Sequence, residues 1–140
     1  MYKKILVPLD GSAASETALP HAQALAKQFG AELELISVVV PTMMGDPSMS
    51  NMIEKEEVNE ETTYLDGKVA ELNKAGYTAS AKVTEGLITD AILHAQVNEG
   101  VDLIVMATHG RTGLKHLLLG SVAESVVRTA RVPVMLIRIV

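Results

Sequence analysis

Short apolar runs alternate along the whole chain with longer segments whose apolar residues recur at helical spacing. The apolar runs predict strands over residues 4–9, 33–40, 78–84, 102–107 and 132–140. The helical segments predict helices over residues 15–29, about 51–75, about 88–98 and 121–130, with a loop over 41–50. Most of the strands are continuous apolar runs, which indicates burial on both faces. This alternation predicts an α/β fold in which helices cover both sides of a parallel sheet.

The length and amino-acid composition of the chain limit the kinds of protein that it can be. The 140 residues suffice for one domain, and its core must be aliphatic because aromatic residues make up only 3%. The lack of cysteine excludes disulfides and thiolate chemistry and suits the cytoplasm. No apolar stretch approaches the roughly 20 residues of a membrane-spanning helix, so we expect no membrane insertion.

The charge is uneven along the chain. Residues 45–72 hold eight acids and two bases, whereas the net charge of the whole chain is −5. We interpret the acidic segment as a solvated helix face. The rest of the chain is close to neutral, which argues against non-specific binding to nucleic acid.

The segment after the fourth strand carries the strongest chemical signal. A loop with Gly110 and Gly113 leads to Gly120 and Ser121, which open a helical pattern. Such a loop brings backbone N–H groups and a helix N-terminus toward a phosphate. The alternative is structural: the glycines only form turns, and Ser121 and Glu124 form a capping box. In a parallel sheet the ligand crevice lies at the carboxyl ends of the strands, where residues 10–12 and 108–119 would meet if the first and fourth strands are neighbours.

The chain shows no other catalytic or metal-binding pattern. It has neither a P-loop nor a G-x-G-x-x-G sequence after a strand. Its four histidines lack ligand spacing, and Ser12 stands in no nucleophile elbow. We therefore expect no catalytic residue and no metal ligand, and any hydrolysis of a bound nucleotide would be slow.

Two stretches carry a resemblance that covers the whole chain. KKILVPLDGSAAS at the start and DLIVMATHGRTGLKHLLLGSVAESVVRTARVPVMLIR at the end are typical of the universal stress protein family. The nucleotide-binding branch of that family carries G-x-x-G, nine residues, then G-[S/T], and Gly110, Gly120 and Ser121 match it. Ala107 departs from it, since it stands where glycine is usual. The resemblance implies one domain over residues 1–140, with a Rossmann-like, adenine nucleotide alpha hydrolase-like sheet in the strand order 3-2-1-4-5.

The resemblance also implies the site residues. Asp10 would contact the ribose or the adenine edge, although an Asx turn within Asp-Gly-Ser is an equally good interpretation. The base would lie against the backbone of Val38 and beside Met106. The remaining implied nucleotide-binding residues are Pro8, Leu9, Ala107, Gly110, Arg111, Gly120, Ser121 and Val122.

The implied function is that of a cytoplasmic stress-response sensor or regulator that binds ATP, ADP, AMP or cyclic AMP. A Mg²⁺ ion would be held through the phosphates. The family commonly forms homodimers through the last strand, here Val132 to Val140, and an apolar strand at a sheet edge is normally covered. Two alternatives remain: a nucleotide-free dimeric interaction module, which Ala107 favours, and an enzyme that transfers an adenylyl or phosphoryl group.

Overall fold

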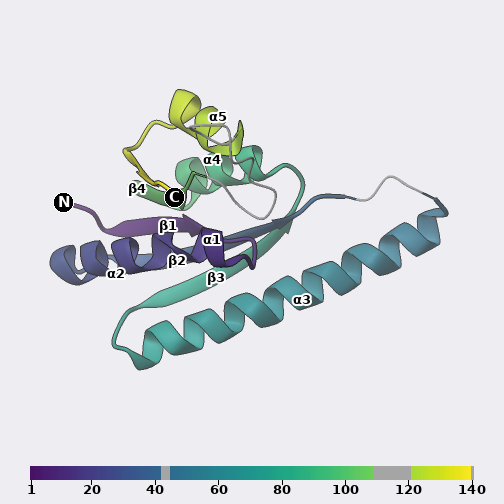
Figure 1. The fold of residues 1–140 in the computed structure, drawn as a ribbon, viewed down its shortest axis with the longest axis horizontal. Helices are drawn as coiled ribbons and strands as arrows, with labels where there is room; N and C mark the ends of the chain where they lie inside the picture. Colours follow the sequence, from purple (N-terminus) through teal and green to yellow (C-terminus); the bar gives the residue numbers. More distant parts are fainter. Residues whose placement is uncertain (42–44, 109–120, 140) are drawn as a thin grey trace.

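The computed structural model describes residues 1–41, 45–108 and 121–139. Within these residues strands and helices alternate as the sequence predicts (Figure 1). In chain order the elements are β1 (Lys4–Pro8), α1 (Ala13–Glu16), α2 (Ala18–Phe29), β2 (Glu32–Val39), α3 (Pro47–Lys74), β3 (Ala79–Glu85), α4 (Ile88–Asn98), β4 (Leu103–Ala107), α5 (Ser121–Thr129) and β5 (Val134–Ile137).

The strands form one parallel sheet in the order β3-β2-β1-β4-β5, which confirms the predicted order. β1 lies at the centre and pairs with β2 along its whole length, Lys4 opposite Glu32 and Pro8 opposite Ile36. On its other side β1 pairs with β4, Ile5 opposite Leu103. The carboxylate of Asp102 accepts hydrogen bonds from the backbone N–H groups of Lys3 and Lys4 at 2.8 and 3.1 Å, which fixes β1 to the start of β4.

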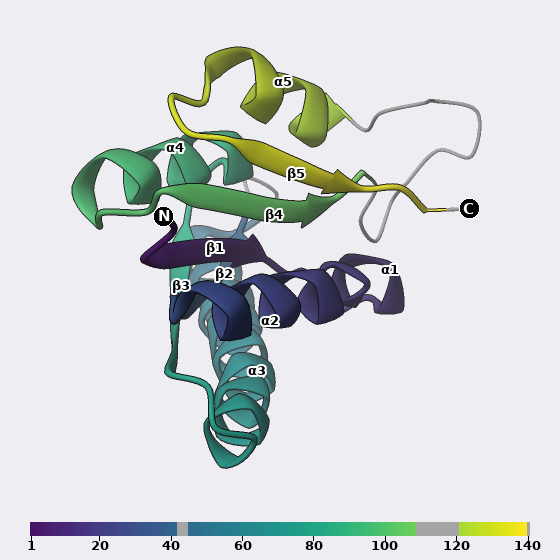
Figure 2. The ribbon, with the colours of Figure 1, turned by 90° about the vertical axis from the view of Figure 1, so that its left-hand side faces the viewer.

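Each face of the sheet has its own aliphatic core, as continuous apolar strands require. Helices α1, α2 and α3 cover one face, and α4 and α5 cover the other (Figure 2). Alternate residues of one strand belong to different cores. In β1, Ile5 and Val7 point to the first face, whereas Leu6 points to the second.

The single helix predicted over residues 15–29 is wrong. The segment forms two helices, α1 and α2, which meet at Thr17. Pro20 has no N–H to donate to the carbonyl of Glu16, so a continuous helix would lose a hydrogen bond there. The predicted end of α2 is confirmed, because Gly30 adopts a left-handed conformation with φ of 68°.

Two further boundaries differ from the prediction. α3 begins at Pro47, inside the predicted loop, because the Asp46 carboxylate caps the helix through the Ser48 N–H at 3.1 Å. β5 spans only Val134–Ile137 of the nine residues predicted. Along the described residues, no helix is long and apolar enough to cross a membrane.

Candidate functional site

The carboxyl ends of β1 and β4 are neighbours, as the site hypothesis requires. β1 pairs with β2 on one side and with β4 on the other, so the order of the strands reverses there. Figure 2 shows α1 and the start of α5 at this same end of the sheet. After β1 ends, Leu9 still donates its N–H to the carbonyl of Ile36 at 2.8 Å. The backbone after β1 is thus held toward β2. In open α/β sheets, ligands bind at such a reversal of strand order.

Asp10 is half-buried and forms the Asx turn that the sequence left open. Its Oδ1 accepts hydrogen bonds from the backbone N–H of Ser12, at 2.9 Å, and from the Ser12 hydroxyl. Gly11 between them has a φ of 85°, a conformation that suits glycine. The turn fixes the direction of the carboxylate just after the end of β1. A fixed carboxylate is what ribose recognition would need, so the two interpretations are compatible.

Ser15 is a part of this turn that sequence reasoning missed. Its hydroxyl accepts a hydrogen bond from the N–H of Asp10 at 3.2 Å and donates one to the carbonyl of Ser12 at 3.0 Å. Ser12 in turn caps α1, since its Oγ accepts from the N–H of Ser15 at 3.0 Å. The signal was present as Asp-x-Ser-x-x-Ser, an Asx turn followed by a serine N-cap.

Ala107, the departure from the family pattern, lies in β4 without strain. No residue other than glycine has a positive φ in the described part of the chain, so the backbone at Ala107 does not require glycine. Its neighbours Leu103 and Val105 pack under the helices of the first face, and strand alternation places the Ala107 methyl on that face, where the residue is 8% exposed.

The backbone of Ala107 faces β1. Thr108 donates its N–H to the carbonyl of Ile137 in β5, at 3.0 Å. Successive residues of a parallel strand turn their peptide groups to opposite neighbours, so the Ala107 N–H is directed toward the end of β1. The side chain of Met106 packs into the core of the second face and is 5% exposed. The methyl of Ala107 is therefore directed into the core under α1 and α2.

Val38 lies near the end of β2, beside a pocket of about 470 Å³. The pocket is lined by Val38, Val39, Val40, Glu57, Glu60 and Glu61. Glu61 is oriented by the buried Ser37, whose hydroxyl donates to its Oε2 at 2.7 Å. The volume is within the range of ligand sites. Three carboxylates would repel a polyphosphate, so this side of the sheet suits a base rather than phosphates.

The predicted phosphate-binding residues are only partly described. Ser121 is exposed and is the first residue of α5, while Val122 packs against the core of the second face. Glu124 pairs with Arg128 at 2.7 Å, one turn further on. Gly110, Arg111 and Gly120 lie outside the described residues. Pro8 and Leu9 are both buried at the end of β1.

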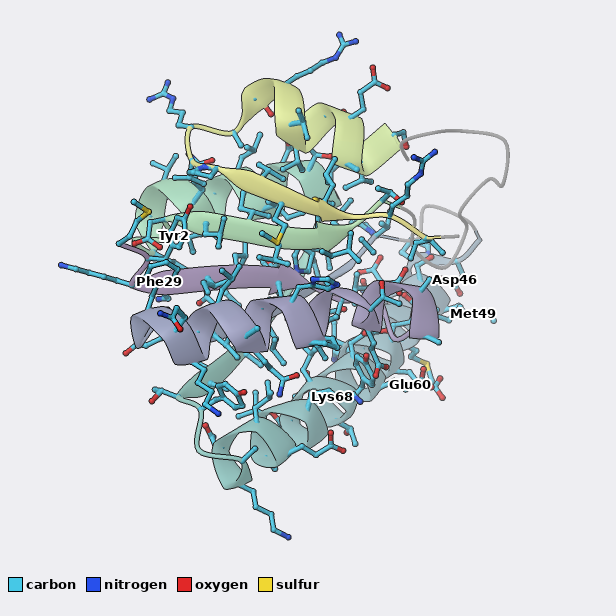
Figure 3. All side chains as sticks on the ribbon, turned by 60° about the vertical axis from the view of Figure 1, so that its left-hand side comes forward. Tyr2, Phe29, Asp46, Met49, Glu60 and Lys68 are labelled. Carbon is cyan, nitrogen blue, oxygen red and sulfur yellow. The ribbon has the colours of Figure 1, made fainter. Side chains whose placement is uncertain are left out.

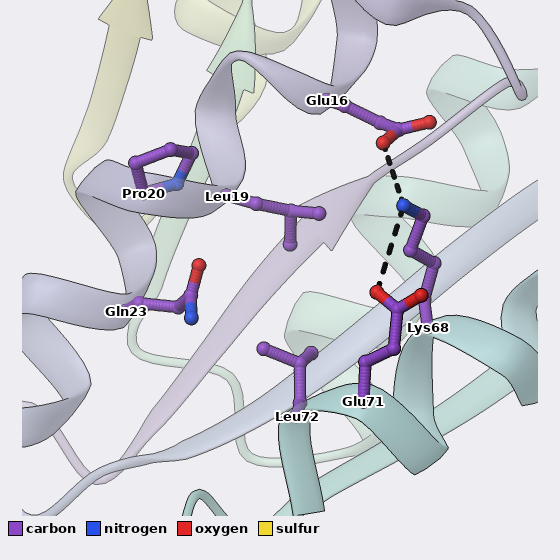
Figure 4. A pocket seen from close by; sticks show the side chains of 7 residues that line it. All are labelled: Glu16, Leu19, Pro20, Gln23, Lys68, Glu71 and Leu72. Carbon is purple, nitrogen blue, oxygen red and sulfur yellow. Dashed lines mark ion pairs between the residues drawn. The ribbon is translucent and has the colours of Figure 1, made fainter. Parts of the chain in front are cut away.

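A second pocket, of about 270 Å³, is lined by residues of α1, α2 and α3 (Figure 4). Lys68 bridges Glu16 at 2.7 Å and Glu71 at 3.8 Å, and the Tyr64 hydroxyl donates to Glu16 at 2.7 Å. The Lys68 ammonium holds the pKa of Glu16 below its ordinary value, and Glu16 raises the pKa of Lys68. Each charge is compensated by a neighbour, which is typical of a structural ion-pair network.

A buried charge cluster lies under α4, and sequence reasoning missed it. Glu34 of β2 is 7% exposed, and its Oε1 lies 3.9 Å from the Lys4 ammonium. Glu99, at the end of α4, pairs with Lys82 of β3 at 2.8 Å. Among the described side chains, Oε2 of Glu34 and Oε2 of Glu99 are buried without a hydrogen-bond partner.

Protonation of Glu34 explains how the carboxyl groups of Glu34 and Glu99 can be buried together. Burial and the neighbouring Glu99 carboxylate raise the pKa of Glu34 to about 7. The hydrogen bond from Lys82 lowers the pKa of Glu99. A proton on Glu34 lets its carboxyl group donate a hydrogen bond to the neighbouring Glu99. Glu34 is thus a neutral acid in the folded chain below about pH 7.

The described residues contain no group of three or more histidine, aspartate or glutamate side chains arranged to hold a metal ion. His21 and His94 are exposed on helices. At the ends of β1 and β4, the described residues thus offer backbone groups and one oriented carboxylate, Asp10.

Comparison with known proteins gives consistent similarities. The family model described as the universal stress protein family matches residues 1–138. The universal stress protein MJ0531 of Methanocaldococcus jannaschii is 38% identical over 145 residues, which cover 99% of this chain and 83% of the relative. The universal stress protein MJ0577 of the same organism is 30% identical, covering 99% of this chain and 96% of its own.

Solved structures agree with the fold. The structure of MJ0577 superposes with a TM-score of 0.91 at 31% identity, covering 100% of this chain and 98% of that one. A universal stress protein in complex with cAMP has a TM-score of 0.66 at 22% identity, covering 98% of this chain and 97% of its own. At 22% identity, the similarity to the cAMP complex supports only the fold.

Proposed function

The chain belongs to the universal stress protein family, and from that premise we propose that it binds an adenine nucleotide and acts as a stress-response sensor or regulator in the cytoplasm. The observation that carries the proposal is the pairing of β1 with both β2 and β4, which puts a strand-order reversal beside Asp10. In open α/β sheets, ligands bind outside the carboxyl ends of the strands at such a reversal.

Each residue would contribute one kind of contact. The Asp10 carboxylate, fixed by its turn, would accept hydrogen bonds from the ribose hydroxyls. The base would lie against the backbone of Val38 and beside Met106, whose side chain packs into the core of the second face. Pro8 and Leu9 would form the floor, and the N–H of Ala107 is directed toward that floor.

The phosphates would lie at the start of α5. The N–H groups of Ser121 and Val122 belong to the first turn of that helix, where four donors have no partner within the helix and the dipole is positive. Gly110, Arg111 and Gly120 complete this proposed set on sequence grounds, with Arg111 as the cation for the phosphate oxygens.

The ligand is proposed as ATP, with ADP, AMP and cyclic AMP as members of the same class. Cyclic AMP is included because one universal stress protein of the same fold is described as a complex with cAMP. A Mg²⁺ ion would be held through the phosphates of ATP. We propose binding without rapid turnover, because the residues around Asp10 engage one another in a turn and a helix cap.

We also propose a homodimer through the C-terminal strand. β5 is at one edge of the sheet, and its Met135 is 36% exposed. An apolar edge strand of this kind is normally paired or covered. Sedimentation velocity on the purified chain checks the proposal, and a monomer at micromolar concentration would reject it.

The nucleotide proposal is tested with Gly120→Val and a matched glycine variant. Titration of Mg-ATP into the wild-type chain should release or absorb heat, and acid extraction of freshly purified protein should yield an adenine nucleotide. Gly120→Val should weaken binding by about 100-fold, because a branched side chain would block close approach of phosphate to the backbone. Gly67→Ala in α3, where an added Cβ meets no atom within 4 Å, should bind as the wild type does.

Two results would contradict the proposal. No extracted nucleotide together with no heat on titration would leave the chain as a nucleotide-free interaction module. Unchanged affinity in Gly120→Val would place the phosphates elsewhere.

A further inference from the structure

The amino-terminal half of α3 presents apolar side chains that the described fold leaves uncovered. Met49, Met52 and Ile53 are 61%, 70% and 40% exposed. Their spacing of three and four residues places them on one side of the helix. Exposed apolar side chains are ordinary when scattered, but a contiguous group on one element marks an interaction site.

The two halves of α3 differ in their packing. The carboxyl-terminal half buries Leu65 and Leu72 against the sheet, whereas Ser50 is the only buried residue between 47 and 60. Figure 1 shows the amino-terminal half running past the ends of the strands, and Figure 3 shows Asp46, Met49 and Glu60 along it. A helix in water gains most of its stability from packing. This half therefore lacks the packing partner that the other half has.

Acidic side chains continue the same side of the helix. Glu56 and Glu60 follow Met49, Met52 and Ile53 at helical spacing, and both are exposed. At 100° per residue, all five lie within about a 100° arc. We name these five residues the α3 stripe. Residues 46–61 around it hold six carboxylates and one lysine, Lys55.

The negative charge around the α3 stripe determines which kind of partner can bind there. A second copy of the chain would bring carboxylates against carboxylates, which is unfavourable. An anionic surface, such as a nucleic acid or an acidic membrane, would be repelled for the same reason. A cationic helix with one apolar side has the complementary pattern. Methionine side chains adapt to varied apolar partners, which suits such a surface.

We propose that the α3 stripe docks a basic amphipathic helix of a partner protein. The apolar side chains of the partner pack on Met49, Met52 and Ile53, and its lysine or arginine residues pair with Glu56 and Glu60. The stripe is small compared with a stable interface, so the complex is transient, with a dissociation constant on the order of micromolar. Met49, Met52 and Ile53 lie outside the pocket beside Val38, whereas Glu60 also lines that pocket.

The test uses a synthetic peptide as the probe. An 18-residue peptide of leucine and lysine, with leucine at positions i, i+3, i+4 and i+7, is compared with a scrambled peptide of the same composition. Fluorescence anisotropy at physiological salt should show at least tenfold tighter binding of the amphipathic peptide. Met52→Ser/Ile53→Ser should reduce that binding at least tenfold. Glu56→Gln/Glu60→Gln should reduce it several-fold and weaken its salt dependence.

The control is Val97→Ser on α4, where an equally exposed apolar side chain (67%) is removed from another surface. It should leave peptide binding unchanged, and circular dichroism should show every variant to be folded. Equal binding of the two peptides, or wild-type binding by Met52→Ser/Ile53→Ser, would overturn the proposal. A concentration-dependent dimer that Met52→Ser/Ile53→Ser abolishes would assign the stripe to a second copy instead.

Discussion

Asp10 and Glu34 are carboxylic acids on neighbouring strands, yet their surroundings are opposite. Asp10 follows β1, is half-buried and accepts two hydrogen bonds from a serine two residues away. Glu34 lies within β2, is 7% exposed and has one oxygen without a hydrogen-bond partner. The first acid is oriented by local donors, and the pKa of the second is raised to about 7, mainly by burial.

The difference separates two uses of an acidic side chain. A carboxyl group fixed by its own turn at the end of a central strand can receive a ligand without further ordering. A carboxyl group buried beside Glu99 makes the fold sensitive to pH instead, because it must lose its proton as pH rises. A local turn after β1 thus sets the orientation of Asp10, whereas burial within β2 sets the protonation of Glu34.

The largest predicted effect tests the buried acid. The pKa of Glu34 is raised from 4.5 to about 7 in the folded chain, so the folded state binds the extra proton between those values. Its contribution to stability is fully present below pH 4.5 and is lost as pH rises through about 7. Glu34→Gln, a neutral mimic, should remove this loss and be more stable than the wild type at pH 8 by about 2–3 kcal/mol.

Urea unfolding at pH 5 and pH 8 measures the effect. Glu32→Gln, an exposed glutamate of the same strand, is the control and should follow the wild-type pH dependence. Parallel pH profiles for Glu34→Gln and the wild type would show that Glu34 is ionised in the folded chain, and the contrast with Asp10 would disappear.

A smaller effect is expected at Asp10. Asp10→Ala removes the acceptor for two donors of Ser12 and should cost about 1 kcal/mol of stability. Asp10→Asn keeps an Oδ1 acceptor, so its stability should stay within about 0.5 kcal/mol of the wild type. The same variant should bind Mg-ATP more weakly if the charge contacts the ribose. Wild-type affinity in Asp10→Asn, measured by calorimetry, would reduce the role of Asp10 to the turn.

The smallest effect extends the comparison to a third acid, Glu16. It is paired with Lys68 at 2.7 Å near the surface, where side chains keep access to water. Lys68→Met should therefore change the free energy of unfolding at pH 7 by no more than about 1 kcal/mol. The pKa of Glu16 is lowered by Lys68, so the contribution is present above its ordinary value of 4.5 and is lost in acid. If chemical unfolding shows that Lys68→Met lowers the free energy of unfolding by more than about 2 kcal/mol, the Glu16–Lys68 pair matters as much for stability as the buried cluster.

Much of the fold could be predicted from the sequence, because its signals are local. The apolar runs gave the strands, and Gly30 gave the end of α2. The Asx turn at Asp10 was foreseeable since its donor, Ser12, is two residues away. The break at Thr17 was missed because helical spacing continues across it, and Pro20 near a helix start is ordinarily tolerated.

The buried cluster could not be predicted in the same way. Lys4, Glu34, Lys82 and Glu99 come from β1, β2, β3 and the end of α4, and only the folded sheet brings them together. In the sequence, Glu34 is a single charged residue within the predicted apolar strand over residues 33–40. Likewise, the register of the strands is needed to tell on which side of β4 the methyl of Ala107 lies. The phosphate-binding residues Gly110, Arg111 and Gly120 remain predictions from the motif.

The central position of β1 has a consequence for how the chain is made. β1 leaves the ribosome well before its second neighbour, β4, which begins only at Leu103. At about 5–20 residues per second, the strand has one open side for several seconds of synthesis. Ile5, Leu6 and Val7, each fully buried at the end, are then exposed on a nascent chain. The amino-terminal segment is therefore where we expect a chaperone to bind during translation.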